Sequence, residues 1–437
     1  MTGNVEAMAI WNPQAESLSR DEMERLQLDR LRACVARVLR AVTPLAARLR
    51  AAGIGDARDI RSLTDLRLLP FTTKSDLRDH YPLGLLAVPR DEVIRIHASS
   101  GTRGKPSVAA YTRNDLAIWS EVMARCLTMA GVRRGMVIHN AYGYGLFTGG
   151  LGIHQGAELL GCTVVPISGG FTQRQAMLLR DFGGNVLCCT PSYALNIAEA
   201  LDQASIDVRT LNLELGVFGA EPWTEQMRAE IERRLGLTAV NLYGLSEIIG
   251  PGVSAECREA RNGSHVHEDH FLPEIIDPET GEVVPAGREG ELVLTPVTKE
   301  ALPLLRYRTG DIAALEVAPC ICGRTTVRMS RIRGRRDDML IIRGVNLYPS
   351  EIERILLGVP EMAPHYQLVV ERPGALDELS LLCEPARDGL DRDQIGARLQ
   401  HELHQQTGIT VAVRVVDRGQ VPRSEGKAAR VVDRRVR

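Results

Sequence analysis

The sequence predicts an α/β protein with two domains, a large N-terminal α/β domain and a small C-terminal α+β domain. The chain has 437 residues, more than one hydrophobic core usually supports. Short apolar runs alternate with helical patterns between residues 93 and 297, which indicates α/β layers with largely parallel sheet. A polar, basic stretch at residues 330–338 then precedes a segment with strands and helices of its own, which predicts the second domain.

The first predicted element is an amphipathic helix that follows Ser19. Ser19 and Glu22 have capping-box spacing, and apolar residues recur at helical intervals from Leu28 to Val42. Pro44 ends or bends this helix, because proline lacks the backbone N–H that a helix interior needs. We expect it to pack against the core.

The next elements alternate between buried strands and helices. Strands are expected at residues 137–139, 162–166, 185–189 and 215–218, and helices at residues 173–180 and 224–235. Residues 277–281 form a turn between two extended runs, so residues 275–294 predict an antiparallel hairpin. In the C-terminal segment, strands and helices are expected at residues 339–342, 349–357, 365–371, 379–384 and 391–408.

Composition excludes several classes of protein. Apolar residues make up 44% of the chain, charged residues 25%, and the formal net charge is −2. These values are typical of a globular enzyme-sized protein and argue against general binding to nucleic acid or membranes. We expect no signal peptide and no membrane span. The nine cysteines are odd in number and the chain is large, so we expect a reducing cytoplasm and no disulfide framework.

A loop rich in glycine and hydroxyl residues follows the predicted strand at residues 93–97. Its candidate phosphate-binding residues are Ser99, Ser100, Gly101, Thr102, Gly104 and Lys105. Backbone N–H groups of such a loop can converge on phosphate oxygens. The loop is not a Walker A motif, because Ser99 and Pro106 replace required residues, which argues against a P-loop kinase. Taken alone, the loop could equally be a surface turn.

Two more candidate segments lie where predicted strands end. They are Gly219, Ala220, Glu221 and Pro222, and then Tyr243, Gly244, Ser246 and Glu247. A tyrosine and a proline-containing turn could enclose an adenine, and a serine with a glutamate could hold phosphate and Mg²⁺. An ordinary strand-to-loop corner is the alternative for each.

The remaining candidate residues carry charged side chains. Asp311 follows a turn, and a carboxylate can accept hydrogen bonds from both ribose hydroxyls. Arg335 and Asp337 lie in the polar stretch between the domains. Lys427 follows a glycine near the C-terminus, where a solvated tail is the alternative.

These six motifs in this order resemble the core motifs of the adenylate-forming superfamily, which comprises acyl-CoA ligases, adenylation domains and luciferase-like enzymes. Further segments resemble the phenylacetate-CoA ligase family of aryl-CoA ligases, at residues 97–101, 142–150, 187–193, 250–253, 268–271 and 422–427. The resemblance extends over residues 11–433. It implies a multi-layer domain at residues 1–334 and a mobile lid at residues 335–437, with a hinge near Asp337 and the active site between them.

The resemblance also implies the reaction. An aryl acid, phenylacetate or a benzoate- or anthranilate-type acid, reacts with ATP and Mg²⁺ to give an acyl-adenylate and pyrophosphate. The acyl group then passes to CoA, and AMP is released. A carrier-protein phosphopantetheine is the alternative acceptor, since it presents the same thiol. The resemblance further implies that the protein forms a homodimer. Its other partners would be small molecules.

Individual roles follow from the resemblance for the matching positions. Residues 99–105 close over the β- and γ-phosphates, residues 219–222 and Tyr243 form the adenine site, and Glu247 associates with Mg²⁺. Two positions depart from the family pattern: Arg103 stands in place of threonine, and Asn241 stands where relatives often carry aspartate. These departures leave the role of Arg103 and a polar adenine contact at Asn241 open.

For the ribose and the chemistry, the resemblance names three residues. Asp311 and Arg335 lie at the ribose, and Lys427 matches the catalytic lysine of adenylation. A lysine there offsets the repulsion between the attacking carboxylate and the α-phosphate. A non-catalytic nucleotide-binding protein would not need Lys105, Glu247, Asp311 and Lys427 together.

The acyl pocket is expected around Tyr142, Phe147, Gly149 and Gln155, which match the segment that lines the aryl site in relatives. Relatives often carry an aromatic residue at the position of Gln155. If Gln155 faces the ligand, its buried amide needs a partner, which favours an amino or hydroxyl substituent on the ring. Core packing is the alternative.

A structural zinc site is the last hypothesis. Cys320 and Cys322 lie at a tight turn, and Cys257 and His265 lie eight residues apart in another loop-like stretch, with His267 and His270 as near alternatives to His265. Three cysteines and one histidine form a ligand set typical of structural zinc, with no position left open for catalysis. Free thiols are the alternative. A thiol hydrolase using Cys188 or Cys189 is not supported, because no motif places a histidine beside them.

Overall fold

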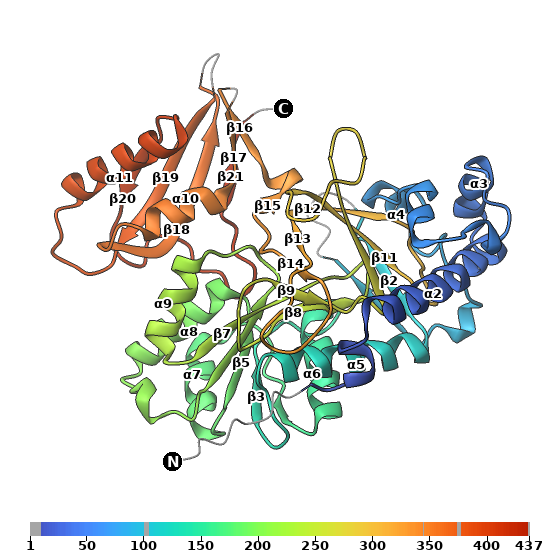
Figure 1. The fold of residues 1–437 in the computed structure, drawn as a ribbon. Helices are drawn as coiled ribbons and strands as arrows, with labels where there is room; N and C mark the ends of the chain where they lie inside the picture. Colours follow the sequence, from blue (N-terminus) through green and yellow to red (C-terminus); the bar gives the residue numbers. More distant parts are fainter. Residues whose placement is uncertain (1–9, 100–104, 344, 374–376, 436–437) are drawn as a thin grey trace.

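The computed structural model describes residues 10–99, 105–343, 345–373 and 377–435. A large N-terminal part carries a smaller C-terminal part at one end, as Figure 1 shows. The helices of the N-terminal part are α1 Pro13–Glu16, α2 Arg20–Ala41, α3 Thr43–Ala51, α4 Lys74–Asp79, α5 Arg113–Met129, α6 Thr148–Leu160, α7 Thr172–Asp181, α8 Pro191–Gln203 and α9 Glu225–Leu235. Short 3₁₀ helices are η1 Ala57–Asp59, η2 Leu63–Leu68, η3 Arg90–Glu92, η4 Val208–Thr210 and η5 Arg336–Asp338.

The predicted first helix is confirmed as α2. Ser19 is its N-cap, and its hydroxyl accepts from the Glu22 backbone N–H at 3.4 Å while Glu22 accepts from the Ser19 backbone N–H at 3.0 Å. The helix ends at Ala41, and α3 starts directly afterwards with Pro44 in its first turn. Its buried stripe, which includes Leu31, Val35 and Val38, packs on the main core.

A nine-stranded sheet organises the N-terminal part, in the order β13-β14-β9-β8-β7-β6-β5-β3-β4. Its strands are β3 Val137–Asn140, β4 Thr163–Val165, β5 Val186–Cys189, β6 Leu215–Gly219, β7 Thr238–Leu245, β8 Gly250–Glu256, β9 Ser264–Val266, β13 Leu315–Glu316 and β14 Arg328–Met329. Strands β4, β3, β5, β6 and β7 pair in parallel, and β8 reverses direction beside β7. The predicted parallel strands are therefore confirmed.

Helices cover both faces of this sheet, which explains why its strands are apolar throughout. In β5, Val186 and Cys188 join the core shared with α5 and α6, whereas Leu187 and Cys189 join the core shared with α7, α8 and α9. Helix α6 packs so closely on α5 that a Cβ at Gly156 would lie only 2.3 Å from the Cβ of Met123.

A second, antiparallel sheet has the order β10-β11-β12-β15, formed by β10 Phe271–Ile276, β11 Gly290–Pro296, β12 Tyr307–Ala313 and β15 Gly334–Arg335. The pairing of β10 with β11 confirms the predicted hairpin. A separate antiparallel pair, β1 Arg95–Ala98 and β2 Val108–Tyr111, flanks the glycine-rich loop.

The C-terminal part has its own hydrophobic core. It contains β16 Leu340–Ile342, β17 Val345–Leu347, α10 Pro349–Leu357, β18 Met362–Glu371, β19 Glu378–Pro385, α11 Arg392–Thr407, β20 Ala412–Val415 and β21 Val431–Asp433. Its four-stranded sheet has the order β20-β19-β18-β21. The α+β character predicted for this segment is confirmed; the domain boundary after residue 334 stays a prediction.

Candidate active site between the two domains

The base of the glycine-rich loop is closed by two hydrogen bonds. The Ser99 N–H donates to the Ser107 carbonyl at 2.9 Å, and the Ser107 N–H donates to the Ser99 hydroxyl at 3.0 Å. Beyond this point the Lys105 ammonium lies 5.1 Å from the centre of the Tyr81 ring. Ser100, Gly101, Thr102, Arg103 and Gly104 lie outside the described residues.

A cavity opens where the parallel strands β6 and β7 end. The described residues that line it include Ala220, Glu221, Pro222, Asn241, Tyr243, Gly244, Asp311, Arg335 and Lys427. Gly219 is required at the end of β6, because a Cβ there would lie 2.0 Å from the Leu242 carbonyl oxygen. Ala220 follows with φ of 71°, a left-handed conformation that costs an alanine energy and is found at functional turns.

Three of the predicted nucleotide-binding residues form one hydrogen-bonded group. The Tyr243 hydroxyl donates to Asp311 Oδ2 at 2.6 Å, and the Arg335 guanidinium donates to Asp311 Oδ1 at 3.1 Å. Strands β12 and β15 place Asp311 directly opposite Arg335. Burial raises the pKa of Asp311, and the Arg335 charge opposes that rise. Each carboxylate oxygen keeps acceptor capacity for a further hydroxyl.

Arg335 also connects this group to the predicted hinge. Its guanidinium donates to Asp337 Oδ1 at 3.0 Å, and the Asp337 side chain is largely exposed at the start of the C-terminal part. The hinge role of Asp337 stays a prediction.

Glu247 lies in the turn between β7 and β8, and this turn is fixed from behind by three side chains. The Thr148 and Ser246 hydroxyls lie 3.1 Å apart, the Tyr111 hydroxyl donates to the Ile249 carbonyl at 3.0 Å, and the Trp119 indole N–H donates to the Pro251 carbonyl at 2.8 Å. Sequence reasoning missed Tyr111 and Trp119. Their rings stack 5.0 Å apart, which adds to the rigidity of the support.

The C-terminal part delivers Lys427 to the same cavity. The Lys427 side chain is exposed, and its charge opposes the burial-driven rise in the Asp311 pKa. The neighbouring Ala428 N–H donates to Glu221 Oε2 at 2.9 Å, and Glu221 Oε1 accepts from the Ser192 N–H at 2.7 Å. Glu221 therefore has protein partners for its carboxylate, which the sequence did not suggest.

The expected acyl-pocket segment surrounds the start of α6. Tyr142 is buried, and a Cβ at Gly149 would lie 3.3 Å from its ring, so the two residues pack against each other. Phe147 precedes the helix and is 49% exposed. The Gln155 amide oxygen, turned toward Arg95 on β1, accepts from its guanidinium. This protein partner satisfies the amide without a ligand, so the preference for a polar ring substituent loses its main support.

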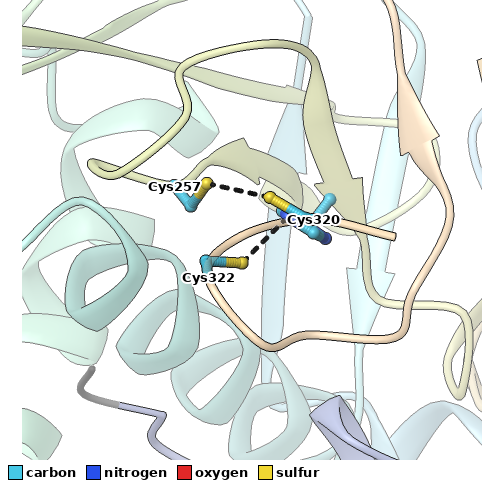
Figure 2. Close-up of side chains that lie close together, drawn as sticks. Cys257, Cys320 and Cys322 are labelled. Atoms are coloured by element: carbon cyan, nitrogen blue, oxygen red, sulfur yellow. Dashed lines mark hydrogen bonds between the residues drawn. The ribbon is translucent and has the colours of Figure 1, made fainter. Parts of the chain in front are cut away.

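The four predicted metal ligands converge. The ligand atoms of Cys257, His265, Cys320 and Cys322 all lie within 4.8 Å of one another. Figure 2 shows the three sulfurs turned toward a common point: Cys257 Sγ is 3.6 Å from Cys320 Sγ, and Cys322 Sγ is 3.3 Å from His265 Nε2. His265 Nδ1 lies 3.1 Å from the Thr326 hydroxyl, which fixes the ring with Nε2 facing the sulfurs.

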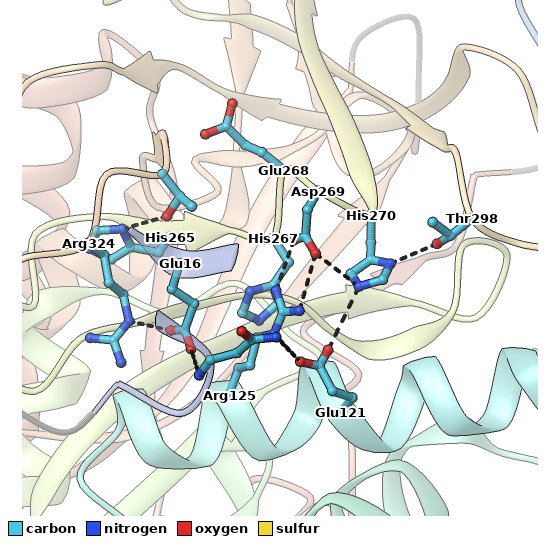
Figure 3. Close-up of polar contacts among 12 residues, drawn as sticks. Glu16, Glu121, Arg125, His265, His267, Glu268, Asp269, His270, Thr298 and Arg324 are labelled. Carbon is cyan, nitrogen blue, oxygen red and sulfur yellow. Dashed lines mark hydrogen bonds and ion pairs between the residues drawn. The ribbon is translucent and has the colours of Figure 1, made fainter. Parts of the chain in front are cut away.

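The two alternative histidines have other neighbours, as Figure 3 shows. His267 Nε2 is 3.2 Å from Cys126 Sγ, and His270 Nδ1 is 2.8 Å from the Thr298 hydroxyl. Of the three histidines, His265 is the one that completes the cluster. The chemistry of the four donors fits a structural zinc.

A buried ion-pair network beside this cluster ties the core helix α5 to the rest of the domain. Arg125 binds Asp269 through two hydrogen bonds of 2.9 and 3.2 Å, and His270 Nε2 lies 3.1 Å from Asp269 (Figure 3). Burial lowers the pKa of His270 to about 3, so this ring is neutral at neutral pH. Burial would raise the pKa of Asp269, but the charge and hydrogen bonds of Arg125 hold it well below its ordinary value. Such pairs are costly to break singly, since a buried charge would be left alone.

Comparisons with known proteins agree with this geometry. A family model described as AMP-binding enzyme matches residues 30–296, and one described as AMP-binding enzyme C-terminal domain matches residues 344–435. A phenylacetate-coenzyme A ligase of Thermus thermophilus is 52% identical, with 98% of this chain and 100% of that protein covered. One of Escherichia coli is 50% identical over 96% of this chain and 97% of its own.

The chain belongs to the phenylacetate-CoA ligase family of AMP-binding enzymes. The predicted family and enzyme class, an AMP-forming acid–thiol ligase, are confirmed by this membership. The two-domain α/β fold is confirmed by a crystal structure of 2-hydroxyisobutyryl-CoA ligase in the postadenylation state, with a TM-score of 0.92 and 26% identity over 99% of this chain and 94% of that one.

The chain matches one state of that ligase better than another. The TM-score falls to 0.73 for the same ligase in the thioesterification state, although 97% of this chain and 92% of that one are covered. Both parts of the chain contribute residues to this one cavity. In the described part of the chain, no helix is long and apolar enough to cross a membrane.

Proposed function

We propose that this enzyme activates phenylacetate or a closely related aryl acid with ATP and transfers the acyl group to CoA. The observation that carries the proposal is the convergence of Tyr243, Asp311, Arg335 and Lys427 on one cavity between the domains. The similarity to phenylacetate-coenzyme A ligases over nearly the whole chain supports the choice of acid and of thiol.

In this proposal the nucleotide occupies the cavity at the ends of β6 and β7. The turn at residues 219–222 and the Tyr243 ring enclose the adenine, and Asp311 accepts hydrogen bonds from the ribose hydroxyls. Tyr243 and Arg335 hold the Asp311 carboxylate in place before the nucleotide arrives, so little ordering remains to be done on binding.

The phosphates extend from the cavity toward the glycine-rich loop and Glu247. The hydrogen-bonded base at Ser99 and Ser107 holds the loop, and Lys105 contributes positive charge. The partly exposed carboxylate of Glu247, on a turn that Tyr111 and Trp119 hold rigid, fits a Mg²⁺ ion that reaches the protein through one carboxylate and the phosphates. When bound, Mg²⁺ would neutralise part of the phosphate charge.

Adenylation is then a displacement at the α-phosphorus. A carboxylate oxygen of the acid forms a bond to phosphorus, the bond to the β-phosphate oxygen breaks, and pyrophosphate leaves with that electron pair. The Lys427 ammonium bridges the two anions and stabilises the charge that develops. In the second step the thiol sulfur of CoA attacks the acyl carbon, AMP departs, and the thiol proton is lost to solvent or a base.

A panel of acids tests this function. Pyrophosphate release would be measured with ATP and Mg²⁺ for phenylacetate, benzoate, anthranilate and fatty acids, each with and without CoA. We expect release to depend on an aryl acid, with CoA consumed in equal amount. A preference for fatty acids would refute the aryl assignment, and acyl-adenylate that forms but never reacts with CoA would favour a carrier-protein thiol.

We also propose that Cys257, His265, Cys320 and Cys322 bind one structural Zn²⁺. Elemental analysis of the purified enzyme should give about one zinc per chain. Cys322→Ser should lose the metal and unfold at a lower temperature, whereas Cys383→Ser, a buried cysteine of the C-terminal part, should keep it. Absence of metal from the wild-type enzyme, or its retention in Cys322→Ser, would contradict the proposal.

The homodimer is a further proposal that rests on the resemblance to aryl-CoA ligases, and the cytoplasmic setting is one that rests on the cysteine pattern. Light scattering on the eluted enzyme would give the mass of the particle in solution. A mass equal to that of one chain would exclude the dimer.

A further inference from the structure

We propose that Glu199 is a positioning residue for adenylation, because it fastens the C-terminal domain in the orientation that presents Lys427 to the nucleotide cavity. Glu199 lies on α8 of the N-terminal domain, outside every motif discussed above. The proposal rests on the proposed function, since it assumes that Lys427 acts in the first half-reaction.

Glu199 binds two side chains of the other domain at once. Its Oε1 lies 2.7 Å from His365 Nε2 on β18, and its Oε2 accepts from Arg423 Nε at 3.0 Å. A second Arg423 nitrogen donates to Oε1 at 3.2 Å, so the arginine contact is bidentate. The Glu199 side chain is 20% exposed and that of His365 is 8% exposed, so water screens these contacts only in part.

Arg423 is held equally firmly to its own domain. Its guanidinium donates to both oxygens of Glu384 on β19, at 2.9 and 2.8 Å, and the Glu384 side chain is 1% exposed. One arginine therefore bridges a carboxylate on each domain. Displacing Glu199 would leave Arg423 in place on its own domain and would remove the link between the two.

The bridge lies four residues before Lys427, and the loop between them is docked on the same helix. The Asn196 amide donates to the Ser424 carbonyl at 2.6 Å, and the Thr190 hydroxyl donates to the Gly426 carbonyl at 3.0 Å. Asn196 and Glu199 are three positions apart on α8 and so share one face of the helix. In Figure 1, α8 lies beneath the C-terminal domain. Helix α8 is thus the platform for the lysine-bearing loop, and Glu199 supplies its charged contact.

The ionisation of Glu199 agrees with this role. Burial would raise its pKa, but hydrogen bonds from His365 and Arg423 and the charge of Arg423 lower it to about 2. The carboxylate therefore stays charged at neutral pH and keeps the bidentate contact. Burial lowers the pKa of His365, so that ring is neutral at neutral pH and contributes a hydrogen bond only. This chain matches 2-hydroxyisobutyryl-CoA ligase with a TM-score of 0.92 in its postadenylation state and 0.73 in its thioesterification state. The bridge is thus present in an arrangement closer to the postadenylation state, and the proposal assigns it to that orientation.

The test measures both half-reactions in Glu199→Gln, which keeps the shape of the side chain and removes its charge. We expect acid-dependent pyrophosphate release to fall about 10-fold or more, the scale of a lost charge-assisted hydrogen bond. Thioester formation from preformed acyl-adenylate should stay within about twofold, because the proposal assigns the bridge to the adenylation orientation alone. The KM values for ATP and for the acid should change little, since Glu199 contacts neither.

A matched control lies one turn away on the same helix. Asp202 pairs with Arg234 inside the N-terminal domain, so Asp202→Asn should leave both half-reactions unchanged. Arg423→Gln removes the other side of the bridge and should reproduce the Glu199→Gln pattern, and the double variant should be no worse than either single variant. This second variant keeps the test decisive if Glu199→Gln folds poorly.

Equal losses in both half-reactions, or no loss in adenylation by either variant, would overturn the proposal. Failure of the proposed function looks different, because the wild-type enzyme would then release no pyrophosphate with any aryl acid. A fall in the unfolding temperature without a difference between the half-reactions would mean that Glu199 only stabilises the fold.

Discussion

Replacing Lys427 with alanine separates the two half-reactions most sharply. The Lys427 side chain is exposed and has no ion pair within the part of the chain that the structure describes. We therefore expect Lys427→Ala to change the free energy of unfolding by less than about 0.5 kcal/mol. Loss of one preorganised electrostatic donor should raise the adenylation barrier by ~3 kcal/mol or more, which corresponds to about a 100-fold slower reaction.

The assay uses acid-dependent pyrophosphate release for the first step and CoA-dependent consumption of synthetic acyl-adenylate for the second. Lys427→Ala should greatly slow acid-dependent pyrophosphate release. It should leave the CoA-dependent consumption of acyl-adenylate nearly unchanged, because the thiol attack does not need this ammonium. Lys427→Arg, which keeps the charge on a different head group, serves as an intermediate control. Equal losses in both steps, or a large fall in stability, would refute the reasoning.

Three further predictions follow from single contacts. Tyr243→Phe removes the 2.6 Å hydrogen bond to Asp311 and should weaken ATP binding about 10-fold; calorimetric titration giving an unchanged Kd would contradict this. Gly156→Ala places a Cβ 2.3 Å from a side chain of α5 and should cost about 1–3 kcal/mol in urea unfolding, whereas Gly55→Ala, where a Cβ meets nothing within 4 Å, should cost far less. The Glu199 pKa is lowered from 4.5 to about 2, so its stabilisation is complete above pH 4.5 and is lost as pH falls toward 2. The difference in the free energy of unfolding between wild type and Glu199→Gln should narrow over that range. A constant difference would mean that the ionised Glu199 carboxylate is not the source of the stabilisation.

Local patterns in the sequence predicted the elements whose causes are local. The capping box at Ser19 starts α2, and the turn at residues 277–281 joins β10 to β11. The buried strands of the parallel sheet were predictable because helices cover both faces and leave no polar alternation. Helix α5 was missed, and its C-terminal half is buried on all sides.

Local patterns could not predict contacts between segments that are distant in the sequence. Glu221 and Ala428 are 207 positions apart in sequence, and only the docking of the C-terminal domain brings them together. The support of Glu247 by Tyr111 and Trp119 likewise depends on how β2 and α5 lie behind the turn. The sequence prediction named His265 as the ligand and kept His267 and His270 as near alternatives, and the ring positions agree with His265.

The convergence of Asp311 and Lys427 was predictable only through the resemblance to adenylate-forming enzymes. Asp311 lies in strand β12 and Lys427 in a loop, and the local sequence of neither carries a specific signal alone. Their order along the chain made the prediction, and the shared cavity agrees with it. Gln155 shows the limit of this approach, because Arg95, a residue that no motif marked, satisfies its amide.

The most direct test of the account is to look for the acyl-adenylate itself. The enzyme would be mixed with ATP, Mg²⁺ and phenylacetate without CoA, quenched, and examined by mass spectrometry. The account predicts phenylacetyl-adenylate and pyrophosphate in equal amounts, and their conversion to phenylacetyl-CoA and AMP once CoA is added. Formation of ADP and phosphate, or CoA ester that appears without any adenylate, would contradict it.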